Sequence, residues 1–267
     1  MDLTRSALVA SSLVVLPECA STNAELRERA RDAAAWPHLS VLLTDSQTAG
    51  RGRLDRTWNT PPGSALALSV LLRDLPADPV AWGWIPLAAG VAMTDAVAAR
   101  LPGHEVGLKW PNDVLVDGRK ICGILAEVTE GAVIVGTGVN TAMTAQQLPV
   151  PTATSFAALG VDVDADGLVA DYLVGLDAAI AGLSRSGDAV ASGLHAEATA
   201  RCLTLGRTVD VSMPDGTTLN GAATRLAADG RLVIDDGSAE HEVLSGDVVH
   251  VRLAGDPRAN SGLVEGP

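Results

Sequence analysis

Lysine is nearly absent from this chain of 267 residues, in which Lys109 and Lys120 stand against 17 arginines (19 basic residues minus 2). An ammonium group is a compact, strongly hydrated point charge, whereas a guanidinium group is a rigid planar fork. The two lysines therefore indicate positions where arginine does not serve. A point charge suits a phosphate, or a carboxylate that becomes an acyl phosphate, in a tight pocket. Biased composition that happens to retain two lysines is the alternative.

Aromatic side chains are also few, with five Trp, one Tyr and one Phe in the whole chain. The core volume must therefore come from Ala, Val and Leu, and an apolar content of 47% is sufficient for it. A chain of 267 residues predicts one large domain, or a large and a small one.

Positive charge is in short supply as well, since the net charge is −13. Broad binding to nucleic acid or to an anionic membrane needs a basic face, so we expect no partner of either kind. No stretch reaches the roughly 20 apolar residues that span a bilayer. Cys19, Cys122 and Cys202 lack metal-ligand or CxxC spacing, which indicates reduced thiols in a cytoplasmic protein. The apolar run 7–16 lacks a good cleavage site and predicts a buried strand rather than a signal segment.

Hydrophobic periodicity predicts an α+β fold. Apolar runs bounded by turn residues predict strands, and apolar residues at helical spacing predict helices. Thr22 and Glu25 have the spacing of a capping box at the start of the first helix. The expected strands are 7–16, 41–44, 65–72, 106–110, 114–116, 121–127 and 132–139. Four helices are expected. The first begins at Ser21, the second ends near Leu101, and the other two span 168–183 and 189–200.

The character of the chain changes after Gly206, where short apolar runs alternate with Asp-Gly turns. This pattern is typical of a small β-barrel. We therefore expect a mixed β-sheet with packed helices over residues 1–203, a small barrel over 204–254, and a disordered tail over 255–267.

A second chemical signal is the segment Gly50-Arg51-Gly52-Arg53, followed by Arg56, in an otherwise acidic chain. Glycines let the backbone approach a ligand, and arginine suits bidentate contacts to phosphate. We expect this loop to be mobile until an anion neutralises it. A solvated basic loop is the alternative. The phosphate-binding fingerprints of P-loop and Rossmann proteins are absent from the sequence.

Other candidate residues are ambiguous on their own. The triplet from Ser21 to Asn23 is either a helix cap or a polar cluster around a small ligand head. Gln47 is equally open, and Trp58 either belongs to the core or stacks on an aromatic base. Asp113 either binds Mg²⁺, orients a neighbour, or closes a turn with Asn112.

Taken together and in order, these segments resemble the biotin protein ligase family. The segments are S-T-N, then Q-x-A-G-R-G-R with Trp58 five residues beyond the second Arg, then K-W-P-N-D, G-R-K-x-x-G-I-L-x-E and G-x-G-x-N. The resemblance covers residues 21–140 in motifs and extends to about residue 252 in architecture. It implies a catalytic domain with the fold of class II synthetases and lipoyl ligases, followed by an SH3-like barrel.

The resemblance also implies roles for the candidate residues. Three are implied in catalysis: Lys120, Lys109 and Arg53. The residues implied in binding biotin are Ser21, Thr22, Asn23, Gln47, Arg51, Gly52, Arg53, Lys120, Gly123 and Leu125. The residues implied in binding ATP or the adenylate are Arg51, Arg53, Arg56, Trp58, Lys109, Asn112, Asp113, Gly138 and Asn140, the last two in a turn on the nucleotide side. The ligands of a metal ion are not identified.

By this resemblance, the protein uses biotin and ATP, with Mg²⁺, to form biotinoyl-5′-AMP and transfers biotin to a lysine of a biotin carboxyl carrier domain. Asp55 departs from the family pattern, which often has Gly there. The chain before Ser21 has no room for a DNA-binding domain, so we expect a monofunctional ligase. A lipoate or octanoate ligase of the same fold is the nearest alternative, and a biotin or nucleotide sensor without catalytic activity is another.

Overall fold

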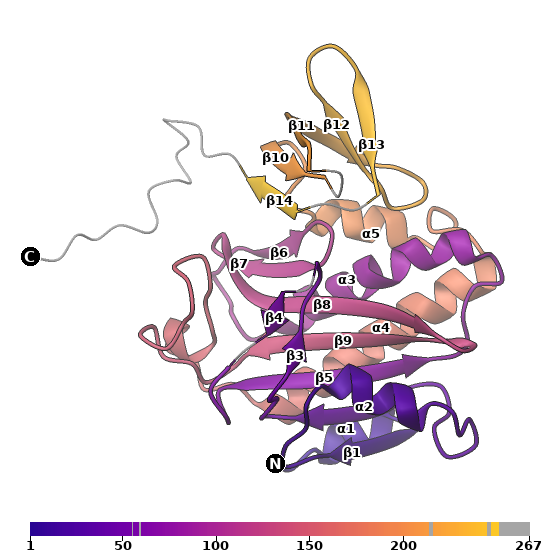
Figure 1. Ribbon diagram of the computed structural model, residues 1–267, viewed down its shortest axis with the longest axis vertical. Coiled ribbons are helices and arrows are strands. Elements are labelled where there is room, and N and C mark those ends of the chain that lie inside the picture. Colours follow the sequence, from indigo (N-terminus) through magenta and orange to yellow (C-terminus); the bar gives the residue numbers. More distant parts are fainter. Residues whose placement is uncertain (55, 59, 214–215, 245–246, 251–267) are drawn as a thin grey trace, which may run out of the picture.

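The computed structural model describes residues 1–54, 56–58, 60–213, 216–244 and 247–250. Its centre is a seven-stranded mixed sheet in the order β1-β2-β5-β9-β8-β7-β6 (Figure 1). Only β1 and β2 pair in parallel within this sheet, and its other pairs are antiparallel. The strands are β1 (Ser12–Val15), β2 (Ser40–Thr44), β5 (Ala65–Leu72), β6 (Val106–Lys109), β7 (Asp113–Val116), β8 (Arg119–Thr129) and β9 (Ala132–Asn140). The predicted α+β class is confirmed.

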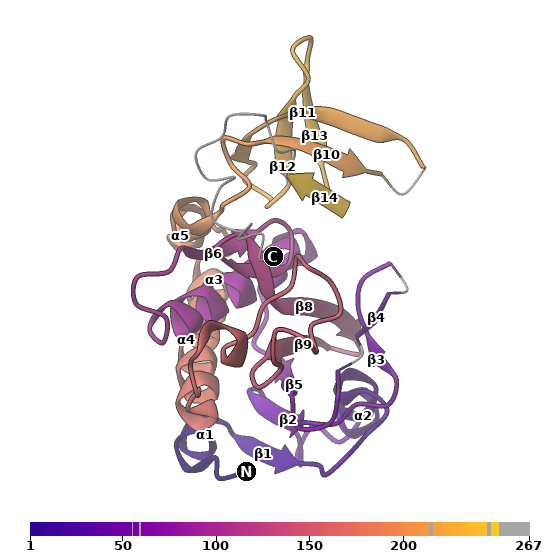
Figure 2. The ribbon, with the colours of Figure 1, turned by 90° about the vertical axis from the view of Figure 1, so that its left-hand side faces the viewer.

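Helices cover both faces of this sheet because its central strands are apolar on both sides. On β2, Val41 and Leu43 belong to the large core, whereas Leu42 belongs to a smaller cluster with Leu26 of α2. This alternation follows from the two-residue period of a strand. Figure 2 shows α1, α3 and α4 on one face, and α2 with the β3–β4 hairpin on the other. These elements are α1 (Thr4–Val9), α2 (Thr22–Arg29), β3 (Gly50–Arg51), β4 (Thr57–Trp58), α3 (Ile85–Ala98) and α4 (Ala165–Ser186).

The C-terminal unit is a five-stranded antiparallel sheet in the order β13-β12-β11-β10-β14. Two buried indoles attach it to the first unit: Trp84 Nε1 donates to Ala228 O, and Trp110 Nε1 donates to Gly230 O. The predicted boundary at 203/204 remains a prediction, and the tail 255–267 lies outside the described residues. The remaining elements are η1 (Pro79–Trp84), η2 (Ala157–Leu159), α5 (Leu194–Arg201), β10 (Thr208–Ser212), β11 (Thr218–Leu226), β12 (Leu232–Asp235), β13 (Glu240–Val243) and β14 (Asp247–His250).

The prediction of a single strand over residues 7–16 is wrong, because the chain forms α1 and then the short strand β1. Asp166, in the first turn of α4, explains why a helix forms here. The carboxylate of Asp166 accepts hydrogen bonds of 2.8 Å from the backbone N–H groups of both Arg5 and Ser6. These donors belong to the first turn of α1, where a helix has no internal partner for them. A distant segment therefore stabilises a helix that the local pattern does not reveal.

Two smaller predictions about helix ends also fail. Ser21, not Thr22, is the N-cap of α2, and no side-chain capping bond forms there. The backbone N–H of Thr22 instead donates to Gln47 Oε1 at 2.8 Å. Helix α5 begins at Leu194 rather than near residue 189, because Gly193 precedes it with a left-handed backbone (φ 86°).

Two helical segments are long and apolar enough to pass a test for membrane spans: Pro79–Ala98 and Ala165–Ser186. Their apolar windows are 72% and 50% buried inside the protein. Core helices pass the same test, so this finding is weak evidence for a membrane span.

Candidate active site

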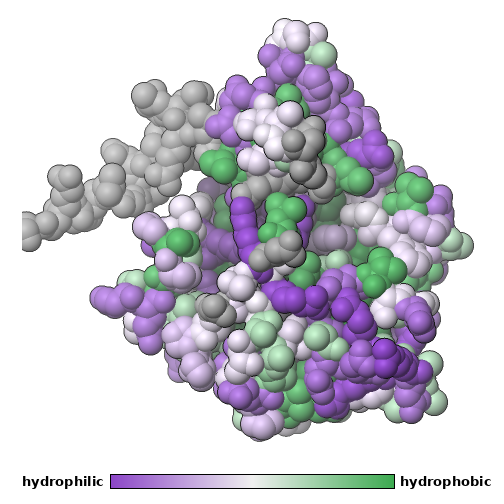
Figure 3. Space-filling model, viewed as in Figure 1, coloured by the Kyte–Doolittle hydropathy of each residue, from purple (hydrophilic) through white to green (hydrophobic). Residues whose placement is uncertain are grey.

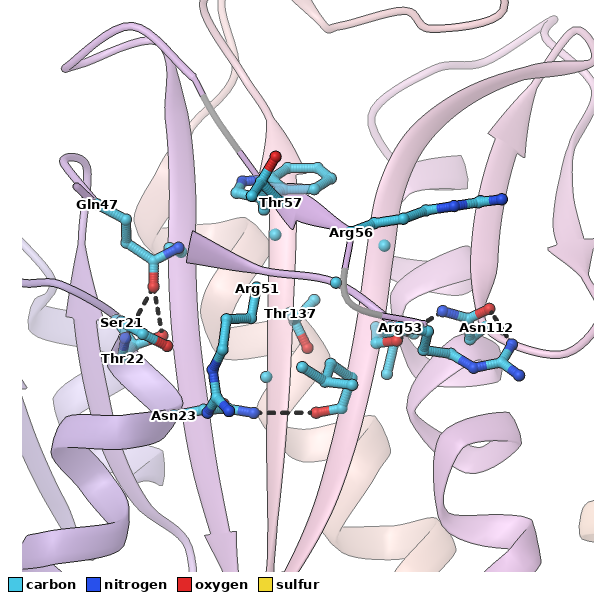
Figure 4. Close-up of a pocket in the computed structure, with 18 of the residues that line it drawn as sticks. Ser21, Thr22, Asn23, Gln47, Arg51, Arg53, Arg56, Thr57, Asn112 and Thr137 are labelled. Carbon is cyan, nitrogen blue, oxygen red and sulfur yellow. Dashed lines mark hydrogen bonds between the residues drawn. The ribbon is translucent and has the colours of Figure 1, made fainter. Parts of the chain in front are cut away.

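A pocket opens where α2, the β3–β4 hairpin and the strands β7, β8 and β9 converge (Figure 4). It gathers all but two of the predicted site residues, the exceptions being Lys109 and Asn140. The lining residues are Ser21, Thr22, Asn23, Gln47, Arg51, Gly52, Arg53, Leu54, Arg56, Thr57, Trp58, Ala67, Asn112, Asp113, Lys120, Gly123, Ile124, Leu125, Gly136, Thr137 and Gly138.

One end of the pocket is a buried polar cluster built on the start of α2. Gln47 Oε1 accepts hydrogen bonds from the backbone N–H of Thr22 at 2.8 Å and from its hydroxyl at 3.2 Å. Asn23 Nδ2 donates to Leu125 O at 3.2 Å and to Glu127 Oε2 at 2.7 Å. The hydroxyl of Ser69 donates to Asn23 Oδ1 at 2.6 Å. The amide orientations at this end are therefore fixed before any ligand binds.

Glycines in paired strands form the floor of the pocket. Gly123 of β8 is the register partner of Gly138 of β9, and Gly136 lies two residues earlier on β9. A Cβ at Gly138 would lie 2.6 Å from the indole of Trp58, and one at Gly123 would lie 2.9 Å from Lys120 Nζ. Side chains from the β3–β4 hairpin and from β8 itself therefore lie directly on the backbone of the sheet.

The opposite end of the pocket carries the positive charge. Lys120 Nζ lies 2.7 Å from Asp113 Oδ1 and 5.8 Å from the centre of a ring of Trp58. Arg53 Nη1 donates to Asn112 Oδ1 at 2.9 Å, so the arginine loop contacts the K-W-P-N-D turn. Figure 4 shows Arg53 and Asn112 together, across the pocket from Asn23. A carboxylate and a phosphate would both find cations here.

The described residues of the arginine loop, 51–54 and 56, contact the sheet and the K-W-P-N-D turn. Arg51 Nη2 donates to Glu127 Oε2 at 3.0 Å, and Arg53 bonds Asn112 as described above. The expectation that this loop is mobile until an anion neutralises it stays a prediction. Asp55, the departure from the family pattern, lies outside the described residues.

The turn predicted at Gly138 and Asn140 is wrong, and two predicted residues, Asn140 and Lys109, do not line the pocket. Gly138 and Asn140 belong to β9 and not to a turn, because β9 pairs with β5 up to the register Ala65–Asn140. The buried Asn140 side chain donates from Nδ2 to Thr154 O at 2.8 Å, outside the pocket. Lys109, at the end of β6, does not line the pocket either, as far as the chain is described.

The structure adds residues that the sequence did not single out. Glu127 ended the G-R-K-x-x-G-I-L-x-E motif and Gly136 began the G-x-G-x-N motif, both without an assigned role, and Ser69 lay inside a strand predicted only as core. Burial would raise the pKa of Glu127, but hydrogen bonds from Arg27 and Asn23 and the charge of Arg51 outweigh it and lower the pKa below its ordinary value. Glu127 is therefore an anion at neutral pH.

Cys122 does not supply a reactive thiol to the site. Cys122 lies under the sheet beside Lys120, and burial raises the pKa of its thiol, so it is not a nucleophile. Among the described residues, no group of three or more His, Cys, Asp or Glu side chains could hold a metal ion.

A second cavity continues from the first under the arginine loop toward the C-terminal sheet. It shares Arg51, Gly52 and Arg53 with the first, and Trp110 and Leu244 line its far side. In Figure 3, hydrophilic and hydrophobic residues lie side by side around the hollow on this face. The polar cluster at one end and the cations at the other suit a ligand with a polar head and an anionic end, and the adjoining cavity leaves room for a second group beyond the cations.

Comparisons with known proteins agree with this geometry. A sequence model described as the Biotin/lipoate A/B protein ligase family matches residues 16–141. A biotin--[acetyl-CoA-carboxylase] ligase of Mycobacterium tuberculosis is 40% identical over 90% of this chain and 89% of its own length. The bifunctional ligase/repressor BirA of Escherichia coli is 36% identical over 49% of this chain and 41% of its own length.

Solved structures show the same fold. The biotin protein ligase from Aquifex aeolicus in complex with biotin and ATP superimposes with a TM-score of 0.74 and 26% identity, covering 91% of this chain and all of its own. This chain belongs to the biotin/lipoate protein ligase family, on the biotin protein ligase side.

Proposed function

We propose that this protein activates biotin with ATP to give biotinoyl-5′-AMP and pyrophosphate, and then transfers biotin to a lysine of a carrier protein. The observation that carries the proposal is the pocket itself. A pre-oriented polar cluster at one end faces cations at the other, and the chain is 40% identical to a biotin ligase over 90% of its length.

The polar end suits the ureido head of biotin, which has one carbonyl acceptor and two N–H donors. The hydroxyl of Thr22 and the amide of Gln47 offer both donors and acceptors, and Asn23 Oδ1 is already held by the hydroxyl of Ser69. We assign the binding of biotin to Ser21, Thr22, Asn23, Gln47, Arg51, Gly52, Arg53, Lys120, Gly123 and Leu125.

The first step joins the biotin carboxylate oxygen to the α-phosphorus of ATP, and the bond from that phosphorus to pyrophosphate breaks. Negative charge builds on the phosphoryl oxygens, and fixed cations stabilise it without reorganisation. Lys120 and Arg53 supply these charges at the end of the pocket, while Asp113 holds the ammonium group of Lys120 in place. We assign Lys109 an assisting role from its place in the K-W-P-N-D motif alone.

The nucleotide is assigned to the same end of the pocket, under the arginine loop. Mg²⁺ would arrive on the ATP phosphates, and no protein ligand is assigned to it. The residues proposed here are Arg51, Arg53, Arg56, Trp58, Lys109, Asn112, Asp113, Gly138 and Asn140, with Asn140 acting through the loop that it holds at Thr154.

In the second step the acceptor amine attacks the acyl carbon, AMP leaves, and the amine loses a proton. A mixed anhydride hydrolyses in water, so a loop that covers it protects the intermediate. The names of the relatives favour the carrier domain of acetyl-CoA carboxylase as acceptor. Three unpaired cysteines favour a cytoplasmic location.

Transfer to a carrier tests the proposal. Purified protein, biotin and MgATP would be incubated with a biotin carboxyl carrier domain, or with the same domain carrying Arg in place of its acceptor lysine. Intact-mass measurement should find one biotin on the first domain and none on the second. Unmodified carrier in both samples, with an active reference ligase alongside, would refute the proposal.

Lipoate or octanoate as the substrate fits the polar end of the pocket less well than biotin does. An alkyl chain offers no donor or acceptor to the polar groups of Thr22 and Gln47, whereas the ureido head of biotin offers both. Octanoate in place of biotin is therefore the matched control.

A further inference from the structure

A β-bulge in β8 places Lys120 on the pocket face of the sheet. Successive residues of β7 pair with Cys122 and then with Lys120, so Ile121 between them is an extra residue in β8. Ile121 and Cys122 both belong to the large core, although consecutive side chains of a regular strand point to opposite faces. The bulge therefore shifts the alternation by one residue, and the ammonium group of Lys120 lies beside Gly123 on the pocket face.

A segment from a loop distant in the sequence, residues 152–154, holds the backbone of Lys120 at the point where β9 ends. The pairing of β8 with β9 begins only at Cys122. Beyond it, Lys120 N–H donates to Thr152 O at 2.7 Å, and Thr154 N–H donates to Lys120 O at 2.8 Å. These two bonds form a parallel β-bridge, so the segment takes the place of β9 beside the lysine.

Asn140, the last residue of β9, anchors this segment. Its Nδ2 donates to Thr154 O at 2.8 Å, and its own carbonyl accepts from Phe156 N–H at 3.3 Å. The side chains of Asn140 and Thr154 are both buried, so water does not replace the bond between them at little cost. The contacts therefore run from Asn140 through Thr154 to the backbone of Lys120. The side chain of that lysine then reaches Asp113 Oδ1 at 2.7 Å.

We propose that Asn140 is a positioning residue, which fixes the ammonium group of Lys120 through the segment 152–154. The bulge sets the direction of the lysine side chain, and the two backbone bonds to the segment keep that direction. Without the anchor at Asn140 the segment relaxes, and the ammonium group moves from Asp113 toward solvent. The inference rests on the proposed function in taking Lys120 as a catalytic group, whereas the placement of its amine is measurable without any substrate.

Competitive amine labelling tests this role, because Lys120 and Lys109 carry the only side-chain amines of the chain. The protein would be treated with limiting acetic anhydride, and peptide mass spectrometry would give the ratio of acetylation at Lys120 to that at Lys109. In Asn140→Ala this ratio should rise roughly 2- to 12-fold, the range of one neutral hydrogen bond, because the amine leaves its ion pair. The kcat of biotin-dependent pyrophosphate exchange should fall by a similar factor, and the KM for ATP should change less.

Ser40→Ala is the matched control, since the buried Ser40 also donates from its side chain to a loop carbonyl, Pro37 O, at 2.8 Å. It should lower the midpoint of thermal unfolding as Asn140→Ala does, and leave the labelling ratio and the exchange rate at their wild-type values. An unchanged ratio in Asn140→Ala, or an equal rise in Ser40→Ala, would overturn the proposal.

If Asn140→Ala fails to fold by circular dichroism, Asn140→Ser takes its place. Its hydroxyl keeps a polar group in the buried site but lies one bond short of the amide nitrogen, so the labelling ratio should rise here too. A wild-type ratio in this variant would contradict the positioning role. Failure of the proposed function is a separate result, because labelling needs neither biotin nor ATP. A wild-type protein that makes no adenylate would refute the function and leave the placement of Lys120 measurable.

Discussion

Replacing Gly136 with alanine should disturb the polar end of the pocket without touching a charged residue. A Cβ there would lie 2.8 Å from both Cγ and Nδ2 of Asn23, and ordinary contact begins at 3.4 Å. Oδ1 of Asn23 would lie closer still, so the amide must retreat by more than 0.6 Å (3.4 − 2.8). A shift of this size would stretch or misalign the 2.6 Å bond from Ser69 and the 2.7 Å bond to Glu127.

The loss can be estimated from these two bonds. A neutral hydrogen bond contributes about 0.5–1.5 kcal/mol and a charged one about 1.5–3, so weakening both should cost about 1–3 kcal/mol. If Asn23 faces the ligand, the affinity for biotin should fall roughly 5- to 150-fold. Calorimetric titration with biotin in the absence of ATP measures this directly, and urea unfolding measures the accompanying loss of stability.

Gly182→Ala is the matched control, since its Cβ would make only an ordinary contact of 3.7 Å with Ser192. Alanine inside α4 should stabilise the protein by roughly 0.5–1 kcal/mol and leave the affinity for biotin unchanged. Wild-type affinity and stability in Gly136→Ala would refute the reasoning, because Asn23 would then not be held by the floor of the pocket.

Three further predictions follow from the charged groups. Lys120→Arg keeps the charge, but the planar guanidinium group does not fit beside Gly123 and Trp58. Exchange of pyrophosphate into ATP should therefore fall by about 10²–10³-fold, while calorimetry should still detect biotin binding. Exchange activity near that of wild type would contradict the argument that this position needs a point charge. Incubation with biotin and MgATP alone should give almost no self-biotinylation by intact mass, because Lys109 and Lys120 carry the only side-chain amines, and heavy labelling would contradict this. The pKa of Glu127 is lowered from 4.5 in the folded protein, so its contribution to stability is complete above that value and is lost as the pH falls through the lower folded pKa. Urea unfolding from pH 6 down to pH 3 should therefore show a steeper loss for wild type than for Glu127→Gln, and parallel curves would refute the role of this carboxylate.

The sequence predicts the strands of the sheet well, because long apolar runs such as 65–72 and 132–139 leave few other solutions. It fails at the N-terminus, where an apolar run of this length fits a helix or a strand, and Asp166, far along the chain, decides between them. Similarly, Gly193 sets the start of α5 through its left-handed backbone rather than through any apolar period.

The candidate site could be predicted where a motif is continuous, as in K-W-P-N-D and G-R-G-R. The contacts of Glu127 could not, since its partners Arg27, Asn23 and Arg51 lie on elements that only the folded sheet brings together. The position of Asn140 shows the opposite error: a motif residue supports a neighbouring loop instead of lining the pocket.

The central claim is that this pocket adenylates biotin, and biotin-dependent exchange between pyrophosphate and ATP tests it most directly. Wild type and Lys120→Ala would be compared with biotin, octanoate and lipoate. The account predicts exchange with biotin alone and none in the variant. Exchange only with octanoate or lipoate, or tight biotin binding without exchange, would contradict it.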